Sequence, residues 1–325
     1  MPSAYVTGST GFVGLNLVQR LAQGGWDVRA LHRSSSDLTY LSRFDAERVV
    51  GDVTDRVSLE RSIPEDVDVL FHVAASVNFW SRNNAGQTAI NVDGTRNVVE
   101  VALTKKPKRF VQISSVVAFG PADGDVLRED SESKAATHWV NYFRTKHLSD
   151  QEVLAGIERG LHACFVHPGY VLGPYELSNF SQMFELLKEG KLPGTFPGSG
   201  PWCHVDGVVD ALIRSAEIGR PGDRYLIGAT HATVADVAGR IARCVGVDPP
   251  KTLPAWQLKS MARIMEWGSF ITGKEPDITP ELVHMFSMDM SFDCSKAERE
   301  LGYREVSLDR MVDDTYAWLK AEGRI

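Results

Sequence analysis

The sequence predicts an α/β fold with a doubly wound parallel sheet and a smaller C-terminal α/β domain. Three observations support this prediction. The first half of the chain alternates short apolar segments with amphipathic helical segments, which is typical of parallel strands joined by helices. Gly8, Gly11 and Gly14 lie between the first such strand and the first helix. After His167, proline and glycine become frequent and the alternation ends, which indicates a second, smaller unit.

The individual elements follow from residue spacing. The first strand is the run Ala-Tyr-Val-Thr at 4–7, and the first helix, 11–23, carries Leu15, Leu17, Val18 and Leu21 at helical spacing. The same criteria predict strands at 27–32, 46–50, 67–73, 109–114 and 161–167, and helices at 58–62, 87–104, 142–159, 234–245 and 308–320. We therefore expect a first domain at 1–168, to which 203–230 returns, and a second, substrate-binding domain at 169–325.

The three glycines predict a dinucleotide-binding loop of the Rossmann type. Gly8 permits a tight turn, Gly11 leaves room for a pyrophosphate, and Gly14 lets the helix pack closely on the strand. The helix N-terminus also directs free N–H groups at the same gap, which makes it an anion site. The expected cofactor contacts in this loop are Thr7, Gly8, Thr10, Gly11, Phe12, Val13 and Gly14.

Further cofactor contacts are expected where the other strands end. In a doubly wound sheet, ligands bind beyond the carboxyl ends of the strands, at the point where the winding direction reverses. Asp52 suits a contact with the adenine amino group, although a turn or helix-cap aspartate explains it equally well. The expected contacts at these strand ends are Asp52, Val53, Ala74, Ala75, Pro168 and Gly169.

The end of the second strand favours NADP(H) over NAD(H). NAD-binding sheets place a carboxylate there for the adenosine ribose diol, whereas this chain has His32 followed by Arg33 and three serines. Without the acid, nothing repels a 2′-phosphate, and Arg33 can bind it. The alternative is that Arg33 is a solvated loop charge.

Tyr142, Lys146 and Ser115 predict a proton relay. Tyr142 and Lys146 are four residues apart at the start of a predicted helix, so their polar ends share one face. A neighbouring ammonium and a positively charged nicotinamide ring both favour the phenolate, which lowers the pKa of the phenol. Ser115 ends the fifth strand and can hold a substrate oxygen beside Tyr142. This arrangement suits proton transfer at an oxygen while hydride moves to or from its carbon.

Together these motifs resemble the extended short-chain dehydrogenase/reductase superfamily and its epimerase/dehydratase group. Within that group, Arg33 and the segment 253–278 are most similar to the branch of dihydroflavonol-reductase-like and 3β-hydroxysteroid-dehydrogenase-like proteins. The matching segments are 7–14, 51–53, 71–75, 91–95, 114–115, Tyr142 with Lys146, 168–174, and 204–206 with Asp210.

The resemblance implies that Ser115, Tyr142 and Lys146 are catalytic and that Lys146 also binds the nicotinamide ribose. It gives Asn91 a structural or cofactor-supporting role, and leaves open a homodimer through the helices 87–104 and 142–159. The expected activity is NADP(H)-dependent interconversion of a carbonyl and a secondary alcohol. Two alternatives remain: a sugar epimerase or dehydratase that uses bound cofactor transiently, and a non-catalytic cofactor-sensing regulator.

The substrate is expected to be a fairly apolar small molecule. Aromatic and apolar residues after the fourth and sixth strands either line a pocket or belong to the core; these are Val77, Phe79, Trp80, Tyr170, Tyr175, Phe180, Phe196 and Trp202. The stretch 258–271 has the same ambiguity. Its apolar residues Leu258, Met261, Ile264, Met265 and Trp267 have helical spacing, which fits a lid, an interfacial helix or core packing.

Composition narrows the class of protein. The net charge of −7 and the lack of a basic stripe argue against a nucleic-acid partner. The four cysteines form no CxxC pair, so neither a metal site nor a disulfide framework is expected. No apolar run approaches the length of a membrane span, and no secretory signal precedes the first strand. We therefore expect a cytoplasmic protein.

Overall fold

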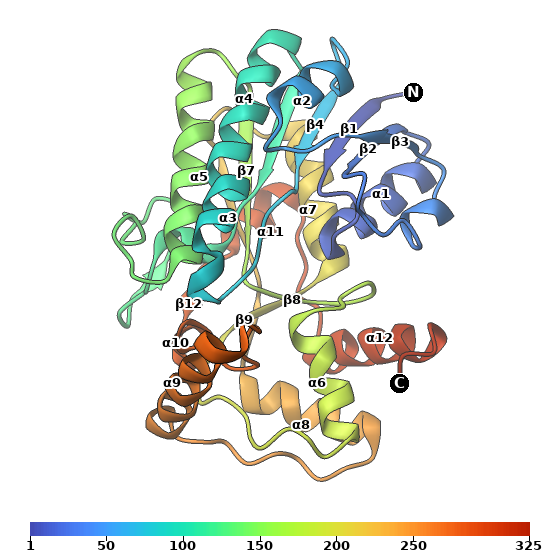
Figure 1. Cartoon of the computed structure of the whole chain (residues 1–325). Helices are drawn as coiled ribbons and strands as arrows, with labels where there is room; N and C mark the ends of the chain where they lie inside the picture. Colours follow the sequence, from blue (N-terminus) through green and yellow to red (C-terminus); the bar gives the residue numbers. More distant parts are fainter.

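The computed structural model describes residues 1–325 except for the side chain of Asn179. Its centre is a parallel sheet with strand order β10-β7-β5-β4-β1-β2-β3 (Figure 1). The winding direction reverses between β1 and β4, which opens a crevice at the carboxyl ends of these strands. The predicted fold class is confirmed. The strands are β1 (Ser3–Thr7), β2 (Asp27–His32), β3 (Glu47–Val50), β4 (Val69–His72), β5 (Arg109–Ile113), β7 (Ala163–Pro168) and β10 (Arg224–Ile227).

Helices cover both faces of this sheet (Figure 1). Ala4 and Val6 of β1 join the core under α1 and α7, whereas Tyr5 joins the core under α2, α4 and α5, because side chains alternate along a strand. One face carries α2 (Arg56–Ser62), α4 (Gly94–Lys105) and α5 (Asn141–Glu158), and the other carries α1 (Phe12–Gln23), α7 (Val205–Ile218) and α11 (Ser295–Leu301).

Most of the remaining elements lie below the main sheet in Figure 1. A second sheet has the order β11-β9-β8, and β6 (Val126–Leu127) pairs with β12 (Ser291–Phe292). The strands of the second sheet are β8 (Tyr170–Leu172), β9 (Ser199–His204) and β11 (Thr230–Thr233). The surrounding helices are α6 (Asn179–Lys188), α8 (Val234–Val245), α9 (Ala255–Thr272), α10 (Pro280–Ser287) and α12 (Leu308–Ala321).

Residues 203–227 divide between the two sheets. Cys203 and His204 end β9 in the second sheet, while α7 packs on the main sheet and β10 pairs with β7. The chain also forms short 3₁₀-helical turns at η1 (Leu41–Arg43), η2 (Ser81–Asn83) and η4 (Val116–Phe119). Within the described residues, none of the helices combines the length and apolar character that crossing a membrane requires.

One predicted helix is interrupted in the structure. The segment expected as a single helix at 87–104 forms α3 (Asn84–Thr88), a π-helical turn η3 (Ala89–Asp93) and then α4. Asn91 lies in this wider turn, where its side chain accepts from Ser76 N at 2.7 Å and donates to Ser76 O at 3.0 Å and Thr145 Oγ1 at 3.1 Å. These bonds fasten the segment after β4 to α5, so the irregular turn has a structural role, as π-turns near functional sites often do.

Candidate active site

The turn between β1 and α1 requires glycine at two positions. Gly8 has φ +67°, and a Cβ there would lie 2.6 Å from Ala74 N. At Gly14 a Cβ would lie 2.1 Å from Gly8 O, so only hydrogen fits between the helix and the turn. In the described structure no side chain caps α1 at Gly11, and the first N–H groups of a helix have no partner within it. The turn therefore offers the donors and the space that a pyrophosphate needs.

Thr7 supports this turn from below. Its side chain is fully buried and its Oγ1 accepts from the backbone N–H groups of Val73 and Ala74, each at 3.1 Å. The same oxygen is 2.7 Å from Nδ1 of His72, whose Nε2 is 3.0 Å from Thr95 Oγ1. Burial and the charge of Lys146 lower the pKa of His72 to about 3, so this imidazole is neutral at physiological pH. Thr7 does not line the cavity described next; it joins β1 to the segment after β4.

A cavity of about 730 Å³ runs along the carboxyl ends of the strands. It is bordered by every predicted cofactor and catalytic residue except Thr7, and these are Gly8, Thr10, Gly11, Phe12, Val13, Gly14, Arg33, Asp52, Val53, Ala74, Ala75, Ser115, Tyr142, Lys146, Pro168 and Gly169. They come from seven separate stretches of sequence. The fold therefore brings together residues that the motifs could identify only one stretch at a time.

Arg33 and Asp52 lie at one end of this cavity and differ in their hydrogen bonding. Arg33 is exposed in the turn after β2, where its backbone N–H donates to Ser36 Oγ at 3.1 Å. Among the described residues its guanidinium has no hydrogen bond or ion pair. Asp52 instead accepts from Thr54 N and Thr54 Oγ1, both at 2.9 Å. Asp52 therefore stabilises a turn through these two hydrogen bonds. Because it also lines the cavity, its contact with the adenine amino group stays a prediction.

Tyr142, Lys146 and Ser115 converge at the other end. Tyr142 and Lys146 lie in the first turns of α5, and both are buried. Lys146 Nζ donates to Ile113 O at 3.0 Å, which fixes the ammonium at the end of β5. Ser115 follows β5, caps η4 by accepting from Val117 N at 3.4 Å, and borders the same cavity as Tyr142. The expected side-chain cluster is thus present.

The pKa values in this cluster are set mainly by burial. Burial raises the pKa of Tyr142 to about 12, and the Ser115 side chain opposes this rise only in part. In the chain without cofactor the pKa is therefore raised, because the loss of hydration is the largest effect on the phenol. The lowering expected when a positively charged nicotinamide ring lies beside Tyr142 stays a prediction. Burial also lowers the pKa of Lys146 to about 8, although the charge of Asp150 opposes the shift. Tyr142 is consequently a protonated phenol at neutral pH.

Aromatic side chains form the wall beside Tyr142. Phe79 has its ring centre 5.5 Å from that of Tyr142 and 6.5 Å from that of Phe286. The ring centre of Phe286 also lies 5.5 Å from that of Tyr170 and 5.4 Å from that of Phe180. The apolar residues that line this part of the cavity are Val77, Phe79, Tyr170, Val171, Phe180, Met285 and Phe286.

Several of the pocket candidates lie elsewhere. Trp202 is fully buried behind Tyr170 and Phe180, with ring centres 4.8 and 4.6 Å away. Tyr175 packs on Tyr40 and Trp318 instead. Outside the cavity lining, Trp80 lies under the Arg82 guanidinium, and Phe196 packs on Phe286. For these four residues, core or surface packing is the correct interpretation.

Sequence reasoning missed a further set of lining residues. Met285 and Phe286 come from α10, whose sequence has no motif that would connect it with the glycine turn. Glu176 is 2% exposed, and its Oε1 accepts from Ser178 N at 2.8 Å. The signal that could have found Glu176 is a single acid within an otherwise apolar stretch after β8. The missed lining residues include Ser76, Glu176, Ser178, Met285 and Phe286.

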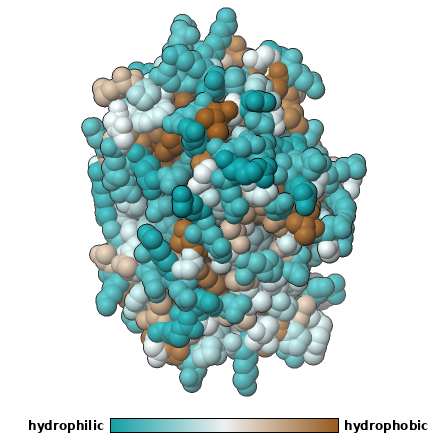
Figure 2. Space-filling view, turned by 180° about the vertical axis from the view of Figure 1, so that it is seen from behind, coloured by the Kyte–Doolittle hydropathy of each residue, from teal (hydrophilic) through white to brown (hydrophobic). Residues whose placement is uncertain are grey.

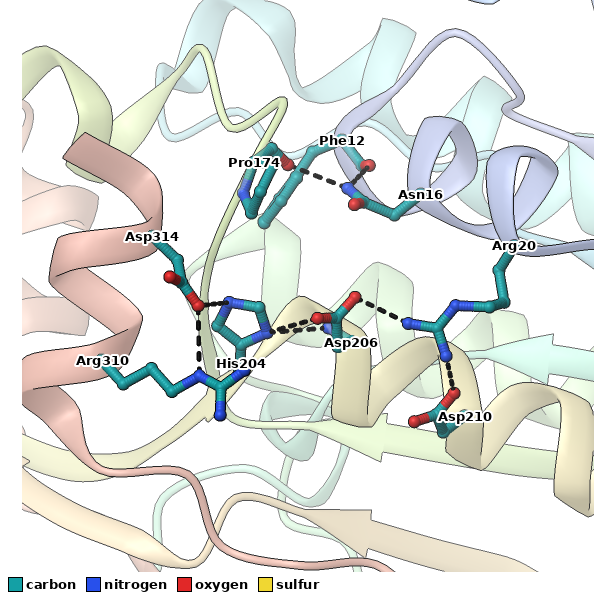
Figure 3. Close-up of polar contacts among 9 residues, drawn as sticks. All are labelled: Phe12, Asn16, Arg20, Pro174, His204, Asp206, Asp210, Arg310 and Asp314. Atoms are coloured by element: carbon teal, nitrogen blue, oxygen red, sulfur yellow. Dashed lines mark hydrogen bonds and ion pairs between the residues drawn. The ribbon is translucent and has the colours of Figure 1, made fainter. Parts of the chain in front are cut away.

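A polar cluster outside the cavity anchors the helix that follows the glycine turn (Figure 3). Asn16 Nδ2 donates to Phe12 O and to Pro174 O, both at 2.9 Å, which ties α1 to the segment after β8. Arg20 pairs with Asp206 at 2.9 Å and also with Asp210 on α7.

His204 extends this cluster from α7 to α12. Its Nδ1 accepts from Asp206 N at 3.1 Å, and its Nε2 lies 3.5 Å from Asp314 Oδ2 (Figure 3). Neither His204 nor Asp206 lines the cavity. The 204–206 motif and Asp210 therefore position α1 and α7 and do not take part in the chemistry directly.

Comparisons with known proteins agree with this geometry. The model of the NAD dependent epimerase/dehydratase family matches residues 4–228. The chain is 29% identical to a putative dihydroflavonol 4-reductase of Synechocystis, over 99% of this chain and 95% of that protein. It is 27% identical to sterol demethylase protein B of Methylococcus capsulatus, over 98% of this chain and 99% of that protein.

A solved structure agrees over the whole chain. The crystal structure of gox2253 superposes with a TM-score of 0.85 at 31% identity, and the match covers all of both chains. The protein accordingly belongs to the NAD-dependent epimerase/dehydratase family, within the extended short-chain dehydrogenases/reductases, and is an NAD(P)-dependent enzyme.

Proposed function

We propose that this enzyme uses NADP(H) to interconvert a carbonyl and a secondary alcohol on an apolar small molecule. The observation that carries the proposal is the meeting of Ser115, Tyr142 and Lys146 with an aromatic wall in one cavity. We further propose that residues 1–168, with 203–230, hold the cofactor and that 169–325 bind the substrate. Tyr170, Phe180 and Phe286 support this division, because they form the apolar wall beside Tyr142.

The residues of the chain fit the cofactor. The glycine turn and the start of α1 would hold the pyrophosphate, Arg33 the 2′-phosphate, and Lys146 the nicotinamide ribose. When bound, the nicotinamide supplies or accepts the hydride. Tyr142 is protonated at neutral pH and donates its proton to the carbonyl oxygen during reduction, while the Ser115 hydroxyl holds that oxygen in place. The Lys146 ammonium stabilises the phenolate that remains.

The direct test is a panel of ketones, aldehydes, sterols and flavonoids, followed at the absorbance of NADPH. Net consumption or formation of NADPH in step with product supports the proposal. An epimerase or dehydratase would convert its substrate with no net change in the amount of NADPH.

The charges of the cavity lining favour the reductase over a sugar-nucleotide epimerase. Within the described residues, the lining contains two arginine or lysine side chains, Arg33 and Lys146, and both are assigned to the cofactor. A nucleotide-sugar diphosphate would therefore find no further cation there.

Replacing Arg33 with aspartate should reverse the cofactor preference. The guanidinium is unpaired at the cavity edge, and a carboxylate there would repel a 2′-phosphate but could accept from a ribose diol. We expect the ratio of NADPH to NADH affinity to fall by roughly ten- to a hundredfold, measured by titration of each cofactor. Arg61→Asp on α2, also exposed but outside the cavity, is the charge-matched control. An unchanged ratio in Arg33→Asp would remove the phosphate assignment.

Carbonyl reduction should decline as the pH rises past about 8. Burial lowers the pKa of Lys146 to about 8, so the ammonium is present below that pH and lost above it. Tyr142, with its pKa raised to about 12, stays protonated throughout this range. The profile of kcat/KM against pH, which reports the free enzyme, should therefore show one falling limb near pH 8. Lys146→Met should be slow and lack this limb; a wild-type profile that stays flat to pH 10 would contradict the assignment.

A further inference from the structure

Helix α9 presents an apolar face to solvent. Its exposed side chains include Trp256 at 66%, Ile264 at 73%, Trp267 at 74%, Phe270 at 64% and Ile271 at 90%. Their spacing places them on one face of the helix, opposite Leu258 and Ala262, which are buried against Val283 of α10. Core packing therefore explains Leu258 but is the wrong interpretation of Ile264 and Trp267. Large aromatic groups of this kind on a surface indicate a binding site.

Basic side chains lie on the same face. Lys259 and Arg263 are exposed on α9, at positions that share the side of Trp256 and Trp267. Two of the acidic residues nearby are hydrogen-bonded to the segment after β4: Glu266 accepts from Ser81 Oγ at 3.3 Å, and the exposed Glu275 accepts from Asn78 Nδ2 at 2.8 Å. Asp277, beyond the end of α9, is exposed. The chain as a whole carries a net charge of −7, so this positive face stands out from the rest of the molecule.

The apolar face of α9 is at the edge of the substrate half. In Figure 1, α9 lies at the lower left, beside α10 and away from the main sheet. The view from behind in Figure 2 is mainly hydrophilic, with apolar side chains in small separate groups. Five of the exposed large apolar side chains lie on α9, whereas the others are scattered over separate parts of the chain.

The α9 face is also connected to the cavity. Arg82 lies over the rings of both Trp80 and Phe270, at 5.4 and 5.8 Å, and donates to Ser269 O at 3.4 Å. These contacts bind α9 to the segment after β4 that carries Phe79 into the cavity wall. On its other side α9 packs on α10, which supplies Phe286 to the same wall.

We propose that α9 docks this enzyme on the surface of an anionic lipid bilayer. Tryptophan prefers the boundary between headgroups and acyl chains, and an interfacial helix combines such rings with lysine and arginine on one side. Lys259 and Arg263 supply the charge complementarity to anionic headgroups, whereas pairing α9 with α9 of a second copy would bring these positive charges together. The helix lies on the membrane and does not cross it. An apolar substrate dissolved in the bilayer would then be close to the aromatic wall, although docking itself does not depend on the proposed reaction.

Vesicle flotation tests this with the whole protein. We expect the wild type to float with vesicles of equimolar phosphatidylcholine and phosphatidylglycerol, to float several-fold less with phosphatidylcholine alone, and to be released by salt. The double variant Ile264→Ser/Trp267→Ser should bind roughly tenfold more weakly, as should Lys259→Gln/Arg263→Gln. Because these side chains are exposed, the variants should keep the wild-type melting temperature.

Controls separate docking from general surface effects and from catalysis. Val57→Ser/Ile218→Ser removes exposed apolar groups from α2 and α7 and should float like the wild type. Absence of flotation with anionic vesicles at low salt would overturn the proposal, and so would equal flotation of the α9 variants and the wild type. A dimer in solution that dissociates in Ile264→Ser/Trp267→Ser, with no vesicle binding, would show instead that α9 pairs with a second copy. Vesicle binding is measured without substrate, so its failure leaves the proposed reaction untouched.

Discussion

Tyr142→Phe should lose turnover by roughly 10²- to 10⁴-fold while binding NADPH almost normally. The phenol is buried, borders the same cavity as Ser115, and is protonated at neutral pH. The substitution removes the proton that reduction requires and leaves the ring that packs against Phe79. Steady-state kinetics with the substrate identified from the panel, together with NADPH titration, would separate the two effects: kcat should fall while the cofactor dissociation constant stays within about twofold.

Tyr170→Phe is the matched control for this experiment. Tyr170 lines the same cavity, is equally buried, and donates its hydroxyl to Met285 O at 3.3 Å. It faces the substrate region without contacting Ser115 or Lys146, so its loss should change kcat by only a few-fold. If Tyr142→Phe kept wild-type turnover, or if both variants lost activity equally, the proton relay would have to be abandoned.

Gly14→Ala should both destabilise the protein and abolish tight cofactor binding. The added Cβ would meet Gly8 O at 2.1 Å and Gly8 C at 2.8 Å, and both atoms are backbone, so α1 must move away from the turn. Overpacking of this kind costs about 1–3 kcal/mol, which corresponds to roughly ten- to a hundredfold in an equilibrium constant. A lowered melting temperature and a weaker NADPH titration would confirm it.

Substitutions at two other glycines separate the effect on folding stability from the effect on cofactor binding. At Gly11 the nearest atom to an added Cβ is Gly8 O at 3.3 Å, so Gly11→Ala should weaken cofactor binding while changing the melting temperature little. At Gly86 an added Cβ would meet nothing within 4 Å, and Gly86→Ala should leave both quantities unchanged or raise stability slightly. If Gly14→Ala melted and bound NADPH like the wild type, the close packing of α1 on the turn would be unimportant.

The local parts of the site could be predicted from the sequence because each depends on neighbouring residues. The glycine turn needs no side chain at Gly8 and Gly14 for steric reasons that operate within a few residues. Tyr142 and Lys146 share a helix face because they are four residues apart. The alternation of apolar strands and amphipathic helices likewise determines the parallel sheet and the edge on which its ligands bind.

Other properties depended on contacts between distant segments. Met285 and Phe286 reach the cavity only because α10 packs below the sheet, and the raised pKa of Tyr142 follows from burial that no local pattern shows. The apolar residues of 258–271 have one spacing but two environments, since Leu258 is buried and Trp267 exposed. Periodicity identifies a helix and its faces, but which face is covered depends on what the rest of the chain packs against it. The sequence by itself therefore determined the fold and the reacting groups, whereas only the tertiary structure decided burial, proton affinity and the surface left open for a partner.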